Sequence, residues 1–283
     1  MDPCQQQQDD EQARLWNGPA GRAWVDAQEV LDAMLAPFEH VLVKASAGRP
    51  AARVLDIGCG TGSTTLAIAR QQGERADCTG VDLSEPMIAL ARARATREGS
   101  KARFLRADAQ EHRFEAGRFD LLVSRFGVMF FVDPVRAFRN LRAAAAPSAE
   151  LCFVAWRGAA ENPFMTTAER SAAPLLPSLP ARRAGGPGQF AFADPALVRS
   201  ILEQSGWDQV DVRAIDEACA LPEAALLPYL NRLGPLGLTL QAEPPDVQAA
   251  VVARVREAFE PYVQGTEVRF SAACWLISAR APA

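Results

Sequence analysis

Residues 54–62 read Val-Leu-Asp-Ile-Gly-Cys-Gly-Thr-Gly, and the expected organisation of the whole chain follows from them. The stretch begins as a short apolar run, which is typical of a buried parallel strand. Three glycines at alternate positions follow, and a helix-like run begins at Ser63. Because glycine has no Cβ, it lets the backbone turn tightly and approach a ligand closely. The pattern therefore predicts a strand, turn and helix that bind a nucleotide, with Thr61 and Ser63 as candidate helix caps.

The spacing of these glycines separates two classes of nucleotide-binding protein. A dinucleotide fingerprint has the spacing G-x-G-x-x-G, which a nicotinamide-dependent oxidoreductase would carry. Here the spacing is G-x-G-x-G, with an acid two residues before the first glycine. This pattern resembles motif I of the class I S-adenosylmethionine (SAM) dependent methyltransferases. The resemblance implies SAM as cofactor and S-adenosylhomocysteine as product, bound by Asp56, Gly58, Cys59, Gly60 and Gly62.

A second strand and helix follow about one unit later. Residues 78–84 form a short apolar run that ends in Asp82, and Ser84 precedes a helix with Pro86 in its first turn. In a doubly wound sheet, an acid at this strand end can accept the ribose hydroxyls of an adenosine. A solvated acid at a strand end is the alternative for Asp82. The resemblance also places Leu83 and Met87 at the cofactor.

The third and fourth expected strands extend the same site. Residues 102–109 end in an acid, and the resemblance implies that Asp108 binds the adenine amine while the Ala109 backbone contacts the ring. Residues 119–131 hold the fourth strand and its exit, where Ser124 is expected near the transferred methyl group. Apolar residues there and on the fifth strand are expected either to line a substrate pocket or to be ordinary core: Phe126, Met129 and Trp156.

The N-terminal region is expected to be a frayed tail over residues 1–10, followed by a helical stretch over 12–43 that Pro37 kinks or splits. Trp16 and Trp24 either pack against the core or belong to a lid over the cofactor. In the lid interpretation, Arg22 reaches the methionine carboxylate.

The predicted fold is α/β: a doubly wound, seven-stranded, mostly parallel sheet of the Rossmann-like methyltransferase type, with the last strand antiparallel at the sheet edge. We expect lid helices over residues 1–48, the SAM-binding core over 49–157, an insertion over 158–193 and the rest of the core over 194–283, with a helical cap at about 217–264. Ser84, Asp133 and Asp194 are expected to cap the helices that follow them, and residues 234–237 are expected to break the chain between two helices. The nearest resemblance is to the ubiquinone/menaquinone-biosynthesis methyltransferases. One departure is Ala-Pro-Ser-Ala at 146–149, where that group usually has Lys/Arg-Pro-Gly-Gly.

Composition excludes several other classes of protein. A net charge of −4 over 283 residues argues against a nucleic-acid partner. The N-terminus lacks the pattern of a signal peptide, and no apolar stretch approaches the length of a membrane span. The six cysteines include no C-x-x-C pair, so we expect reduced thiols and a cytoplasmic location. No metal site is expected.

The resulting hypothesis is a methyltransferase that acts on a small, aromatic or apolar acceptor at carbon, oxygen or nitrogen by in-line displacement. No histidine–carboxylate pair stands out as a general base, so the catalytic residues stay unassigned, with His112, Arg125 and Tyr229 as candidates. The protein is expected to be a monomer or a homodimer. The alternatives are a SAM-binding protein of the same fold with no methyl transfer or a different reaction, and, less favoured, an NAD-dependent oxidoreductase.

Overall fold

The computed structural model describes residues 3–47, 53–73, 77–180 and 186–283. A mixed sheet at its centre is built from β1 (Arg53–Ile57), β2 (Asp77–Asp82), β3 (Arg103–Arg106), β4 (Phe119–Arg125), β5 (Ala145–Trp156), β6 (Asp208–Pro222), β7 (Val263–Gln264) and β8 (Glu267–Arg280). The main path runs β3-β2-β1-β4-β5-β8-β6, and the short β7 pairs with β8. The first five strands are parallel, and β8 is antiparallel to both its neighbours. The predicted doubly wound α/β sheet is thereby confirmed.

The C-terminal strand β8 lies one position inside the sheet edge, because the long β6 pairs with its outer side. Leu276 of β8 pairs with Val154 of β5 on one side and with Arg213 of β6 on the other. The antiparallel direction agrees with the sequence prediction, and the edge itself is formed by β6.

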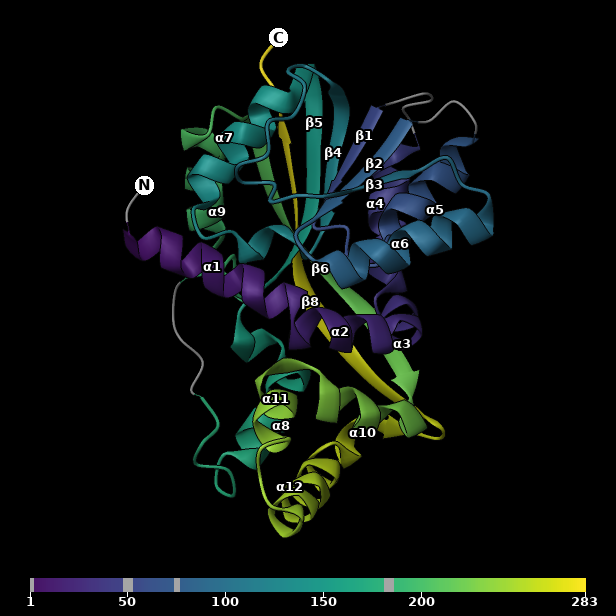
Figure 1. Cartoon of the computed structure of the whole chain (residues 1–283), viewed down its shortest axis with the longest axis vertical. Helices are drawn as coiled ribbons and strands as arrows, with labels where there is room; N and C mark the ends of the chain where they lie inside the picture. The colour runs from purple at the N-terminus through teal and green to yellow at the C-terminus, as the bar shows by residue number, and fades with distance from the viewer. Residues whose placement is uncertain (1–2, 48–52, 74–76, 181–185) are drawn as a thin grey trace.

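Helices cover both faces of the sheet (Figure 1). One face carries α4 (Ala36–Ser46), α5 (Ser63–Gln72) and α6 (Glu85–Glu98), and the other carries α7 (Pro134–Ala144) and α9 (Pro195–Gln204). The acids predicted to begin the last two helices do so: Arg136 N–H donates to Asp133 Oδ1 at 2.9 Å, and Ala196 N–H donates to Asp194 Oδ1 at 2.8 Å. Helices on both faces bury the apolar strands, which explains their nearly continuous hydrophobic sequence.

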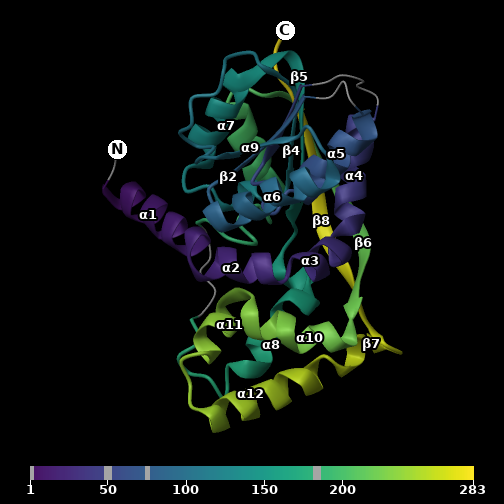
Figure 2. The ribbon, with the colours of Figure 1, turned by 45° about the vertical axis from the view of Figure 1, so that its right-hand side comes forward.

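The N-terminal region forms α1 (Pro3–Asn17), α2 (Pro19–Asp26) and α3 (Gln28–Met34), which run across the end of the sheet where β1 and β2 finish (Figure 2). The predicted frayed tail was wrong for residues 3–10, which are helical. Side-chain hydrogen bonds four residues apart support this first helix, as between Gln6 and Asp10. Pro37 lies in the first turn of α4, so it separates helices rather than kinking one.

A helical cap lies beyond the parallel strands, at the far ends of β6 and β8 (Figures 1 and 2). It contains α8 (Pro163–Ala172), α10 (Glu223–Arg232), α11 (Gly234–Leu240) and α12 (Pro245–Ala258). Short 3-10 turns among the described residues include η2 (Val128–Phe130), η3 (Ala159–Glu161) and η4 (Glu260–Tyr262). The cap has its own aromatic centre, where Phe164 stacks on Phe270 at 3.7 Å between ring centroids and meets Phe259 edge-on. The expected break at 234–237 is instead the start of α11.

Residues 146–149, where glycines were expected, lie in the first part of β5. Ser148 has a φ of 60°, in the left-handed region that favours glycine. We predict that Ser148→Gly relieves this strain and stabilises the protein by about 0.5–1 kcal/mol, which raises the melting temperature by roughly 1–4 °C. Thermal unfolding measures the shift. Ala149→Gly is the control, because Ala149 is the next residue and has no positive φ; it should lower the stability of the protein. A lower melting temperature for Ser148→Gly would contradict the prediction.

Candidate functional site

The glycine turn after β1 adopts the tight conformation that the sequence predicted. Gly58, Gly60 and Gly62 have φ values of 64°, 55° and 87°, all in the left-handed region. A Cβ on Gly58 would lie 2.6 Å from the Cα of Gly127, just beyond β4. The exits of β1 and β4 are therefore in direct backbone contact, and no side chain fits between them.

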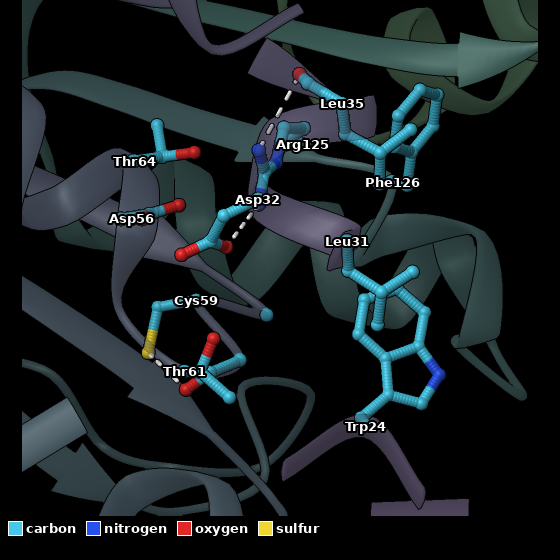
Figure 3. A pocket seen from close by; sticks show the side chains of 12 residues that line it. Trp24, Leu31, Asp32, Leu35, Asp56, Cys59, Thr61, Thr64, Arg125 and Phe126 are labelled. Carbon is cyan, nitrogen blue, oxygen red and sulfur yellow. Dashed lines mark hydrogen bonds and ion pairs between the residues drawn. The ribbon is translucent and has the colours of Figure 1, made fainter. Parts of the chain in front are cut away.

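A cavity of about 30 Å³ lies between this turn and the N-terminal helices (Figure 3). It brings together seven residues that the sequence analysis had singled out: Trp24, Asp56, Gly58, Cys59, Gly60, Arg125 and Phe126. Five others that line it were not predicted as site residues: Leu31, Asp32, Leu35, Thr61, which was considered only as a helix cap, and Thr64. In Figure 3, Trp24, Leu31 and Phe126 form an apolar side opposite the polar side with Asp56 and Thr64.

Asp56 supplies a buried carboxylate to the cavity. Its residue is 1% exposed, and its Oδ2 accepts a 2.6 Å hydrogen bond from the Thr65 hydroxyl. Its Oδ1 has no hydrogen-bond partner within the described part of the chain. Burial raises the pKa of Asp56 to about 7, with the Thr65 hydrogen bond and the Arg125 charge opposing the shift. An unpaired, buried carboxylate oxygen indicates a place for a donor or a cation.

The raised pKa of Asp56 predicts that the free energy of unfolding depends on pH. Between the pKa of the unfolded carboxyl, about 3.9, and about 7, the unfolded chain loses this proton while the folded chain keeps it, so stability falls as pH rises. Asp56→Asn should match the wild type near pH 4 and be a few kcal/mol more stable at pH 8, since each pKa unit corresponds to ~1.4 kcal/mol. Urea unfolding at both pH values tests this. A variant less stable than the wild type at pH 8 would refute it.

Asp82 ties the glycine turn to the end of β2. Its Oδ2 accepts from the Gly60 N–H and its Oδ1 accepts from the Ser84 N–H, both at 2.8 Å. The side chain is half-buried, and this burial raises its pKa. Each carboxylate oxygen keeps a second lone pair for another donor. Behind the turn, Met87 is buried, with its Sδ 3.7 Å from the position of a Cβ on Gly60.

Three predicted side-chain caps were wrong. The residue before α5 is Gly62, with no side-chain cap; the Ser63 hydroxyl donates to Glu39 Oε2, and Thr61 Oγ1 accepts from Arg94 at 3.3 Å. Ser84 precedes α6, but its hydroxyl donates to the Trp16 carbonyl at 2.7 Å. All three hydroxyls form hydrogen bonds with residues of other helices, so tertiary contacts override the local capping preference.

The junction of α1 and α2 docks on the second strand–helix unit. Asn17 donates from Nδ2 to the Leu83 carbonyl at 3.2 Å, and its Oδ1 accepts from the Glu85 N–H at 2.9 Å. The Trp16 ring meets Phe130 edge-on at 5.0 Å and Trp24 at 6.3 Å between ring centroids. Helices at the start of the chain thus cover the predicted cofactor site.

Asp108 lies in a small hydrogen-bonded cluster after β3. Its Oδ1 accepts from the Gln110 N–H at 2.8 Å, and the Gln110 amide donates to Asp108 and to Asp9 of α1. Ala109 is buried, and its carbonyl accepts from Asn140 at 2.9 Å. Sequence analysis missed Gln110, which links α1 to this turn.

Several predicted site residues lie behind the cavity rather than in its lining. Ser124 donates to the Ile57 carbonyl at 2.7 Å and accepts from the Gly127 N–H at 3.1 Å, so it joins β4 to β1. Trp156 stacks on Phe126 with ring centroids 4.7 Å apart. Met129 Sδ accepts a hydrogen bond from the backbone N–H of Trp156, with 3.4 Å between sulfur and nitrogen. These residues support the wall that Phe126 presents to the cavity.

The other candidates do not reach the cavity. Arg22 is exposed on α2. His112 packs its ring against Phe114 in the loop after β3. Tyr229 lies on α10 in the cap, where burial raises the pKa of its hydroxyl to about 12. Of the three catalytic candidates, only Arg125 lines the cavity.

Comparisons with known proteins agree with this geometry. A family model described as a methyltransferase domain matches residues 54–148. The demethylmenaquinone methyltransferase of Thermus thermophilus is 28% identical over 163 residues, which cover 55% of this chain and 74% of that protein. Together these similarities support a class I SAM-dependent methyltransferase. They also support SAM as the cofactor.

Further matches show how much of the chain the similarity covers. An uncharacterised protein of Mycobacterium tuberculosis is 30% identical over 123 residues, and the match spans 44% of each chain. In fold, the methyltransferase is similar to the YcgJ protein of Bacillus subtilis, with a TM-score of 0.57, 19% identity and coverage of 88% of this chain and 99% of that one. No helix among the described residues of the methyltransferase has the length and apolar character needed to cross a bilayer.

Proposed function

We propose that SAM binds at the glycine turn and that its methyl group is transferred to a small aromatic or apolar acceptor. The observation that carries this proposal is the unpaired Oδ1 of Asp56, a residue that lines the cavity beside three left-handed glycines. Asp56 would hold the ammonium of the methionine moiety, and the carboxylate of Asp82 would hold the ribose. Asp108 and Ala109 would hold the adenine, as in the family that the chain resembles.

The apolar side of the cavity supports an apolar acceptor. Trp24, Leu31, Leu35 and Phe126 line it, and Trp156 reinforces Phe126 from behind. Binding pockets for small molecules are typically lined in this way, with few polar groups. The Thermus relative is named for its action on demethylmenaquinone. A hydroquinone or phenol ring is therefore a suitable first acceptor to test.

The protein's own contribution is alignment and exclusion of water. When bound, SAM would supply a sulfonium methyl group, which a nucleophilic carbon, oxygen or nitrogen of the acceptor attacks in line as S-adenosylhomocysteine leaves. Orientation of two reactants can be worth roughly 7–11 kcal/mol of a barrier. No histidine is among the residues that line the cavity. We therefore propose that the acceptor enters already activated, as a phenolate, an enolate or an amine.

The test is methyl transfer from labelled SAM to a panel of quinols, phenols and amines, with product mass as readout. Transfer to a ring carbon, oxygen or amine supports the proposal and identifies the acceptor class. Calorimetric binding of SAM without transfer to any member would favour a SAM-binding protein with another reaction. Binding of NAD in place of SAM would overturn the proposal.

A further inference from the structure

The guanidinium of Arg125 is a buried charge with few close partners. Its side chain is 11% exposed and lines the cavity at the end of β4. Within the described residues, it donates to the Leu35 carbonyl at 3.5 Å and lies 3.8 Å from Asp32 Oδ1. A guanidinium has five N–H donors, and a charge out of water needs close hydrogen-bonding partners. Most donors of Arg125 therefore have room for another acceptor.

Asp32 is the nearest carboxylate, but a different arginine holds it. Its Oδ2 lies 2.8 Å from Arg94 Nη2, and Arg94 also donates from Nη1 to the Thr61 carbonyl at 2.9 Å. Asp32 belongs to α3, whereas Arg94 belongs to α6. The Arg94 pair thus fixes α3 against the glycine turn, and Asp32 gives Arg125 only a longer-range countercharge (Figure 3).

The cavity therefore presents complementary charges to one small ligand. The unpaired Asp56 Oδ1 suits an ammonium group, and the under-coordinated Arg125 suits a carboxylate. The methionine moiety of SAM carries both groups on one carbon. Its sugar and base carry neither.

We propose that Arg125 binds the α-carboxylate of the methionine moiety and that Asp32 is an internal competitor for the same guanidinium. This inference rests on the proposed function. A cavity of about 30 Å³ holds about two water molecules, so it must widen for the amino-acid group to enter, and we propose that this happens by withdrawal of the Asp32 carboxylate from Arg125. Arg22, which is exposed on α2, is not needed for this contact.

Calorimetric titration with two ligands tests the assignment. S-adenosylhomocysteine contains the amino-acid group, whereas 5′-deoxy-5′-methylthioadenosine has the adenosine and sulfur without it. Arg125→Gln should weaken binding of S-adenosylhomocysteine about tenfold and leave binding of methylthioadenosine within about twofold, because only the first ligand loses a charge-assisted pair. Arg125→Lys keeps the charge and should recover part of the loss. Arg254→Gln, an exposed control on α12, should change neither affinity.

The Asp32→Asn variant tests the competition. Its amide oxygen can still accept from Arg94, but the charge that competes for Arg125 is gone, so S-adenosylhomocysteine should bind about threefold more tightly, with methylthioadenosine unchanged. Equal losses for both ligands in Arg125→Gln, or no loss in either, would overturn the inference while leaving the proposed function intact. Weaker S-adenosylhomocysteine binding by Asp32→Asn would also overturn it. A wild-type protein that binds neither ligand would overturn both the inference and the proposed function. If Arg125→Gln fails to fold, Arg125→Lys replaces it, and its loss of affinity for S-adenosylhomocysteine is compared with its loss for methylthioadenosine.

Discussion

Gly58→Ala is expected to abolish SAM binding and to destabilise the fold by more than about 3 kcal/mol. The new Cβ would lie 2.6 Å from the Cα of Gly127, and a backbone atom cannot move aside as a flexible side chain can. The residue would also have to keep a φ of 64°, which costs an alanine about 1–2 kcal/mol. The exits of β1 and β4 would have to separate, which disrupts the cavity between them. Urea unfolding and calorimetric titration with S-adenosylhomocysteine measure the two effects.

Gly265→Ala is the matched control for backbone strain. Gly265 has a φ of 65°, but no atom lies within 4 Å of a Cβ built there. The Gly265→Ala variant should lose only about 1 kcal/mol of unfolding free energy and bind S-adenosylhomocysteine as tightly as the wild type. Equal stability losses in the two variants would show that close packing between Gly58 and Gly127 is not what requires a glycine.

Asp82→Ala is expected to weaken SAM binding about a hundredfold or more. The variant removes the proposed ribose acceptor, and charge-assisted hydrogen bonds contribute roughly 1.5–3 kcal/mol each. It also leaves the Gly60 and Ser84 N–H groups without the carboxylate they now share, so the glycine turn loses its tie to β2. Titration with S-adenosylhomocysteine gives the affinity.

A second ligand and a second variant separate this effect from the one proposed for Arg125. Methylthioadenosine contains the ribose, so Asp82→Ala should weaken both ligands by the same factor. Asp82→Asn keeps one carbonyl acceptor and should lose less affinity for both ligands than Asp82→Ala. Unchanged affinity for S-adenosylhomocysteine in Asp82→Ala would remove this residue from the proposed site.

Local patterns were enough to predict the sheet and the polar side of the cavity. The apolar run before Asp56, the alternate glycines and the acid at Asp82 each depend on neighbours in the chain, so their spacing carries the information. The fold class and the acids that begin α7 and α9 were predicted for the same reason.

Contacts between distant elements could not be predicted in this way. Asp32 pairs with Arg94 from 62 positions away, and nothing in the helical pattern around Leu31 and Leu35 distinguishes this acid from a solvated one. Ser84 was a good cap by residue type, yet its hydroxyl donates to the carbonyl of Trp16.

The pairing of β6 with β8 has a consequence for how this enzyme could diversify. Pro222 and Glu267 are register partners, so the segment between them leaves the sheet and returns to it at one place. A segment with adjacent ends can be lengthened, shortened or exchanged without shifting strand register. The helices in this segment, α10, α11 and α12, could therefore change in length or sequence while the parallel part of the sheet stays the same.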